Sequence, residues 1–164
     1  MDHTEEKSSY RPLLAVIGIA LLAAASIQAG TGAFEAMSFM NRIMGMFFLL
    51  LAMFKFFDLR GFAQGFRMYD IAAKKFQPYA YAYPFIELVL GALYLSGQFL
   101  YFAAIATVLV MAISAAGVFI SMKRGYKFKC ACLGTVLNVP LSTVSLTENI
   151  GMGLMAVYML VQMT

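Results

Sequence analysis

Long apolar stretches, separated by short polar or basic segments, are the feature of this sequence that most restricts its fold. Several contain about 18 or more residues, enough for a helix to cross a hydrocarbon core about 30 Å thick. They are continuously apolar and do not alternate, which argues against a transmembrane β-barrel. The sequence therefore predicts about five transmembrane helices, at 12–29, 37–57, 79–97, 99–122 and 145–163.

The composition points the same way. Hydrophobic residues make up 62% of the 164 and charged residues 12%, whereas soluble domains carry roughly 25% charged residues. We predict an all-α membrane protein in which a cytoplasmic tail, residues 1–11, precedes one compact helical bundle over residues 12–164. The net charge of +4 does not indicate nucleic-acid binding, because the cations stand at the ends of apolar stretches, where they fit lipid headgroups.

The N-terminal residues indicate whether the first helix is a cleaved signal peptide or is retained in the protein. Secretory signals normally begin with a cationic region, but here Asp2, Glu5 and Glu6 offset Lys7 and Arg11. We therefore expect the first helix to be retained; cleavage would leave four spans.

The segment from Asp58 to Gln77 has a mixed pattern. Apolar residues such as Phe62 and Phe66 are interleaved with charged ones, namely Arg60, Arg67, Asp70, Lys74 and Lys75. This pattern fits a helix that lies in the membrane interface, between the second and third spans. The alternative is a plain connecting loop.

The cations also predict the orientation. With the N-terminus in the cytoplasm, every lysine and arginine except Arg42 falls on the inner side, in agreement with the positive-inside rule. Five spans then place the C-terminus outside and the segment between the last two spans at the cytoplasmic face.

That segment contains both cysteines, Cys130 and Cys132. Such a pair can exchange disulfides or bind a soft metal such as Cu(I), Hg(II) or Zn(II), and in both cases the thiolate reacts. Neighbouring Lys127 and Lys129 favour the thiolate. A structural zinc site needs four ligands, whereas the sequence has one histidine. Persistent disulfides are rare in the cytoplasm, which favours a transient redox or metal pair over a structural disulfide; inert packing is the remaining alternative.

Glu87 lies within the third predicted span, three residues after Pro84. A carboxylate there is costly unless it is paired, protonated or solvated, so it is a candidate functional residue. Lys55, near the inner end of the second span, is its expected partner. The pair could transfer protons or could simply stabilise the bundle.

Two further groups have a structural interpretation beside a functional one. Ser145-Leu-Thr-Glu148 matches a capping box, which predicts that the last helix begins there, although Glu148 could also act near the thiols. The second group is a cluster of four methionines, Met37, Met40, Met44 and Met46. Their thioethers could bind Cu(I), but methionine more often fills apolar gaps between helices.

The sequence has no nucleotide-binding loop, metalloprotease helix or nucleophile elbow, which excludes an enzyme with a soluble active site of its own.

Three runs of the sequence carry a family resemblance: RIMGMFFLLLAMFKFFDLRGFAQGFRMYDIAAKK, PFIELVLGALYLSG and CACLGTVLNVPLSTVSLTENIGM. Over residues 41–160 the chain resembles the MauE branch of the DoxX-like membrane proteins. The matching positions are Lys55, Asp58, Tyr69, Pro84, Glu87, Cys130, Cys132, Pro140 and Glu148. The resemblance implies a four-helix core in the bacterial inner membrane, linked to thiol redox and to maturation of methylamine dehydrogenase. Here a leading helix is added, and some relatives carry a heavy-metal-associated domain before that position.

The leading prediction is a thiol–disulfide relay. Cys130 and Cys132 would exchange electrons with a quinone or with the thiols of a partner oxidoreductase, and Glu87 or Glu148 would carry the proton. The alternatives are a soft-metal carrier or sensor, which would use the same two cysteines and a metal chaperone, and a non-catalytic membrane scaffold.

Overall fold

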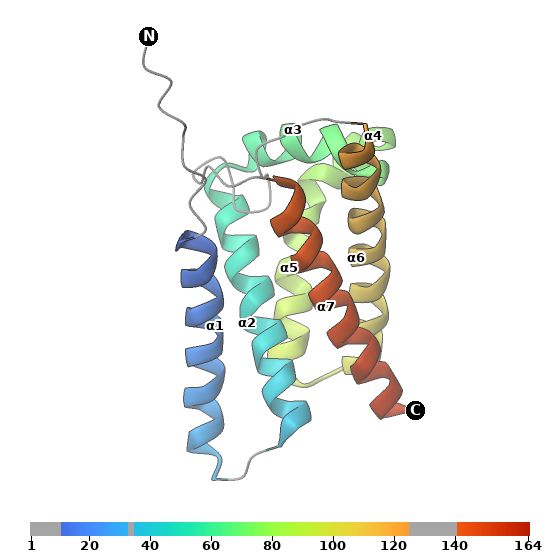
Figure 1. Ribbon diagram of the computed structural model, residues 1–164. Coiled ribbons are helices and arrows are strands. Elements are labelled where there is room, and N and C mark those ends of the chain that lie inside the picture. The colour runs from blue at the N-terminus through green and yellow to red at the C-terminus, as the bar shows by residue number, and fades with distance from the viewer. Residues whose placement is uncertain (1–10, 33–34, 125–140) are drawn as a thin grey trace.

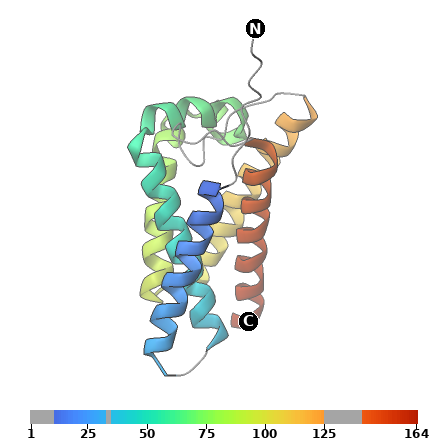
Figure 2. The same cartoon turned by 60° about the vertical axis from the view of Figure 1, so that its left-hand side comes forward.

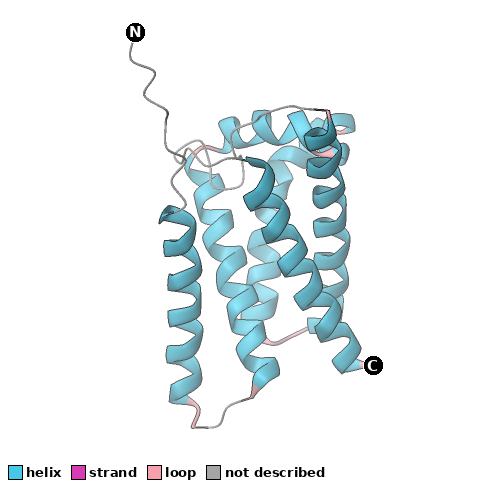
Figure 3. Ribbon diagram, viewed as in Figure 1, coloured by secondary structure: helices cyan, strands magenta, loops and turns pink. Residues whose placement is uncertain are grey.

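The computed structural model describes residues 11–32, 35–124 and 141–164, and within these ranges every regular element is a helix (Figure 3). The helices, labelled in Figure 1, are α1 (Arg11–Gly30), α2 (Ala36–Phe57), α3 (Leu59–Tyr69), α4 (Ile71–Lys75), α5 (Gln77–Ser96), α6 (Leu100–Lys123) and α7 (Leu141–Met163). The five long helices run alternately up and down and form one bundle, while α3 and α4 cross one end of it (Figures 1 and 2).

The long helices follow the apolar stretches closely. Four of them begin and end within two residues of the ranges predicted from the sequence. The capping-box prediction is wrong: α7 begins at Leu141, so Ser145 lies inside the helix. Pro140 directly precedes Leu141 in the sequence, and a proline is tolerated at a helix start because the first N–H groups have no acceptor within the helix.

Two of the described helices, α2 and α6, are long and apolar enough to cross a membrane. A shorter apolar helix, Leu14–Gly30, forms most of α1. These lengths support a helical membrane protein. Of the five predicted spans, the structure supports those formed by α2 and α6.

Close packing of α2 against α5 forms the centre of the bundle. Gly45 and Gly91 face each other, and a Cβ added at Gly91 would lie 3.0 Å from the carbonyl oxygen of Gly45. Beside this contact, the rings of Phe48 and Tyr94 stack with their centroids 6.0 Å apart. Only helices without side chains at the crossing can approach so closely, so the two glycines fix the position of α5 on α2.

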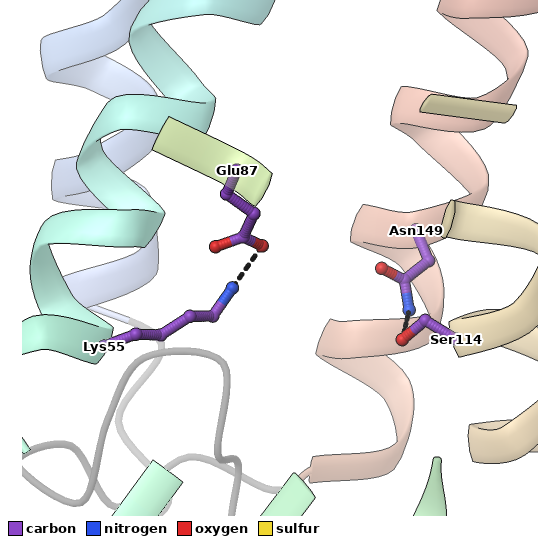
Figure 4. Close-up of polar contacts among 4 residues, drawn as sticks. All are labelled: Lys55, Glu87, Ser114 and Asn149. Carbon is purple, nitrogen blue, oxygen red and sulfur yellow. Dashed lines mark hydrogen bonds and ion pairs between the residues drawn. The ribbon is translucent and has the colours of Figure 1, made fainter. Parts of the chain in front are cut away.

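Hydrogen bonds between buried side chains link α6 to α5 and to α7. The hydroxyl groups of Tyr94 and Thr107 are 3.0 Å apart and connect α5 to α6. Asn149 Nδ2 on α7 donates to Ser114 Oγ on α6 over 3.2 Å (Figure 4). Buried polar groups of this kind fix the register of neighbouring helices, because displacing one leaves its partner unsatisfied.

The two short helices α3 and α4 are held on the end of the bundle by apolar contacts and by capping. The inner face of α3 buries four side chains, Phe62, Ala63, Phe66 and Tyr69. Asp58 Oδ1 accepts from Gly61 N at the start of α3 (2.9 Å), and Asp70 Oδ1 accepts from Ala73 N at the start of α4 (2.8 Å). The mixed pattern of residues 58–77 therefore forms an amphipathic helix and a short second helix rather than a plain loop.

Candidate functional site

A buried ion pair lies beneath α3, between α2 and α5. Lys55, in the last turn of α2, donates from Nζ to Oε1 of Glu87, near the middle of α5 (Figure 4). Each side chain is 1% exposed. The pairing expected from the sequence is thus present. Two charges removed from water at this depth persist only if each stabilises the other.

Aromatic rings complete the surroundings of Lys55. Its Nζ lies 5.3 Å from the ring centroid of Phe62 on α3 and 5.0 Å from that of Tyr83 on α5. Tyr83 in turn packs against Phe66, with ring centroids 4.5 Å apart. The faces of these rings attract a cation, so the ammonium group is stabilised from two directions besides the carboxylate.

Glu87 retains an acceptor atom that its lysine does not use. Oε2 is buried, and no described residue donates a hydrogen bond to it. One turn earlier on the same helix, Pro84 is buried and has no backbone N–H, so the carbonyl of Ala80 lacks its usual helical donor. The end of the bundle under α3 thus combines a carboxylate oxygen able to receive a proton with a weakened stretch of helix.

Asp70 is a second buried carboxylate, at the junction of α3 and α4. It is fully buried, and its Oδ1 accepts from the backbone of Ala72 and Ala73. Burial raises the pKa of Asp70, although these two hydrogen bonds and the charge of Lys74 act in the opposite direction.

The raised pKa of Asp70 predicts a pH-dependent stability. The folded protein keeps the proton to a higher pH than the unfolded chain, so this contribution is fully present below the unfolded pKa and is lost as the pH rises through the folded pKa. Asp70→Asn keeps an oxygen for the cap and cannot ionise. We expect wild type to lose more stability than this variant between about pH 4 and pH 7 in detergent unfolding experiments. Asp58→Asn, at the other capping carboxylate, is the control; equal pH profiles for wild type and Asp70→Asn would contradict the assignment.

Of the remaining residues singled out from the sequence, the structure describes Tyr69 and Glu148. Tyr69 is buried at the last position of α3. Glu148 is half-buried in the second turn of α7. Cys130, Cys132 and Pro140 lie outside the described residues. The segment that contains them follows α6 and precedes α7, and the flanking ends of both helices lie at the end of the bundle that carries α3 and α4 (Figures 1 and 2).

Metal-binding groups do not gather in the part of the chain that the structure describes: no three His, Cys, Asp or Glu side chains lie close enough to hold an ion. Of the clustered methionines, Met44 is fully buried in the core, and Met37 and Met40 pack against it. Their environment is that of apolar filling residues.

Sequence reasoning missed the rings around Lys55. Tyr83 could have been found, because it stands four residues before Glu87 and so shares its helix face. Phe62 could not, since its approach depends on how α3 folds back over the bundle.

Taken together, the apolar bundle, the buried ion pair and the amphipathic helix above it define a helical membrane protein with a polar centre at one end. Residues 33–162 match the family described as methylamine utilisation protein MauE. The chain therefore belongs to the MauE family, a family of membrane proteins linked by its description to methylamine utilisation. The matched region begins at residue 33, so the whole of α1 precedes it. Comparison with curated proteins and with solved structures gave no significant match.

Proposed function

We propose that this protein is a membrane thiol–disulfide relay in which Cys130 and Cys132 form the redox pair and Glu87 accepts the proton. Its physiological role would be to support maturation of, or electron transfer with, a partner oxidoreductase, as methylamine utilisation requires of a helper protein. The partner would be recognised through its own cysteines.

One observation carries the proposal. The described ends of α6 and α7, which flank the cysteine segment, lie at the same end of the bundle as α3 and the end of α2 (Figures 1 and 2). Lys55 of the buried Lys55–Glu87 pair stands in the last turn of α2. Thiol chemistry releases protons. The buried carboxylate paired with Lys55 has an unused oxygen, Glu87 Oε2, which is suited to receive one.

The reaction balances as follows. The Cys130 thiolate attacks a disulfide of the partner, forms a mixed disulfide and releases one partner thiolate. The Cys132 thiolate then attacks the Cys130 sulfur, forming the Cys130–Cys132 disulfide and releasing the second partner thiolate. The pair loses two electrons and two protons. Glu87 holds one of these protons in passing, and the partner's two sulfurs finally gain both electrons and both protons.

Lys55 gives Glu87 its role as a proton acceptor. When Glu87 is ionised, the ammonium group of Lys55 neutralises it. When Glu87 takes a proton, the ammonium group of Lys55 still faces the rings of Phe62 and Tyr83. Cation–π contacts with these rings then stabilise the positive charge of Lys55 in the apolar site.

The redox state of the cysteines provides the test. Cys130 and Cys132 are the only cysteines in the sequence, so a mass-adding maleimide reports on them alone. In membranes, we expect two labels under reducing conditions and none under oxidising conditions, because the pair closes into a disulfide. Cys130→Ser and Cys132→Ser should each take one label under both conditions and should abolish turnover of the partner.

Three results would count against the relay. A pair that keeps two labels at every redox poise does not cycle. Tight, stoichiometric binding of Cu(I) or Hg(II) without disulfide formation would instead identify a soft-metal carrier. Unchanged partner activity in Cys130→Ser would identify a scaffold.

A further inference from the structure

Exposed cations collect at the end of the molecule that carries α3 and α4. They are Arg60, Arg67, Lys74, Lys75, Lys123 and Arg124. We call this set the cationic surface. None of the six forms an ion pair within the described ranges, where Lys55–Glu87 is the only salt bridge.

The geometry of α3 turns its cations outward. Phe62 and Phe66 are buried on the inner face, whereas Arg60, Gln64 and Arg67 are exposed at positions i, i+4 and i+7 on the opposite face. Apolar side chains are exposed among these cations: Met68 is 52% and Phe76 is 62% accessible. The surface therefore offers charge and apolar contact together.

The end of α6 extends the same surface. A Cβ at Gly117 would lie 2.6 Å from the carbonyl oxygen of Tyr69, so the junction of α3 and α4 rests directly on α6. Lys123 follows Gly117 by six residues, a rise of roughly 9 Å along the helix. Its Nζ lies 5.0 Å from the ring centroid of Phe119, which directs the charge along the flank of the bundle. Helices α3, α4 and α6 are thus neighbours at this end.

The carboxylates nearby do not neutralise these cations. Asp58 and Asp70 cap α3 and α4, and Glu87 is paired with Lys55. The carboxylate of Asp70 attracts the charge of Lys74, but Asp70 itself is buried beneath the cationic surface. Glu148 on α7 is half-buried. Within the described residues the only exposed acidic side chain is that of Glu35, between α1 and α2 at the opposite end of the bundle (Figure 1).

We infer that the cationic surface binds the phosphate headgroups of anionic phospholipids such as phosphatidylglycerol. Unneutralised cations attract the phosphates, and the apolar side chains among them suit the boundary between headgroups and acyl chains better than a soluble polyanion. The surface also adjoins α2 and α6, the two candidate spans, so it lies where the headgroups of a surrounding bilayer would be. This inference is independent of the thiol relay.

Native mass spectrometry of the purified full-length protein tests it. The protein is offered equal amounts of phosphatidylglycerol and phosphatidylcholine with the same acyl chains. We expect wild type to retain phosphatidylglycerol at least about tenfold more, a preference for which two cations at about fivefold each would suffice. The variant Arg60→Gln, Arg67→Gln, Lys74→Gln, Lys75→Gln should therefore lose the preference. The charge-preserving variant Arg60→Lys, Arg67→Lys, Lys74→Arg, Lys75→Arg should keep it.

Several outcomes would overturn the inference. Equal retention of the two lipids by wild type would overturn it, and so would the full preference in the four-glutamine variant. Inorganic phosphate that displaces phosphatidylglycerol at equal ionic strength would identify a free-phosphate site instead. If the four-glutamine variant does not fold, the double variant Lys123→Gln, Arg124→Gln takes its place and should show a reduced preference. The salt dependence of wild type is a second measurement, because a headgroup contact weakens as salt rises.

Discussion

Lys55→Met should destabilise the bundle by about 3–5 kcal/mol, because it leaves the carboxylate of Glu87 buried without its partner. Glu87→Met should cost a similar amount, since the ammonium group of Lys55 would then keep only the rings of Phe62 and Tyr83. The double variant should recover most of the loss, because methionines of similar volume fill the site without any charge to desolvate. Unfolding of the three variants in detergent, followed by circular dichroism, measures this coupling.

A neutral pair in the same bundle gives the control. Asn149 and Ser114 are buried and hydrogen-bonded across α6 and α7 (Figure 4). Asn149→Leu should cost about 1–3 kcal/mol, the usual penalty for leaving one buried polar partner unsatisfied. If the double variant at positions 55 and 87 is as unstable as the sum of its singles, the two side chains do not act as a pair.

The same double variant separates stability from function. If Glu87 accepts the thiol proton, the double variant should oxidise its cysteines slowly even though its stability is close to that of wild type. The maleimide assay should then show slow disulfide formation. Rapid oxidation in a stable double variant would remove Glu87 from the relay and leave the cysteines as the only reactive groups.

The sequence allowed much of this architecture to be predicted, for physical reasons. A helix in an apolar environment must satisfy its own backbone, so the apolar stretches set the helix ranges. Lys55 and Glu87 could be paired because isolated charges in apolar stretches need partners. Contacts created by the fold itself were not accessible: the ring of Phe62 reaches Lys55 only because α3 turns back over the bundle. The reactivity of Cys130 and Cys132 stays a prediction.

Gly117 shows why the position of α3 and α4 could not be predicted. In the sequence it is one glycine in an apolar helix, and nothing indicates that the backbone of Tyr69 and Asp70 rests against it. In the structure, a Cβ there would lie 2.6 Å from the carbonyl oxygen of Tyr69 and 3.0 Å from Cα of Asp70. These are backbone atoms, which cannot rotate aside as the end of a flexible side chain can.

Gly117→Ala should therefore destabilise the protein by about 1–3 kcal/mol, because the α3–α4 junction must move away from α6. Gly151→Ala is the matched control: Gly151 lies inside α7, and a Cβ there meets nothing within 4 Å. This control should be neutral or stabilising by up to about 1 kcal/mol, since alanine restricts the unfolded chain. Both are measured as unfolding midpoints in detergent. Because α3 also covers Lys55, Gly117→Ala should in addition slow cysteine oxidation, whereas equal behaviour of the two alanine variants would mean that α3 and α4 are not held by this contact.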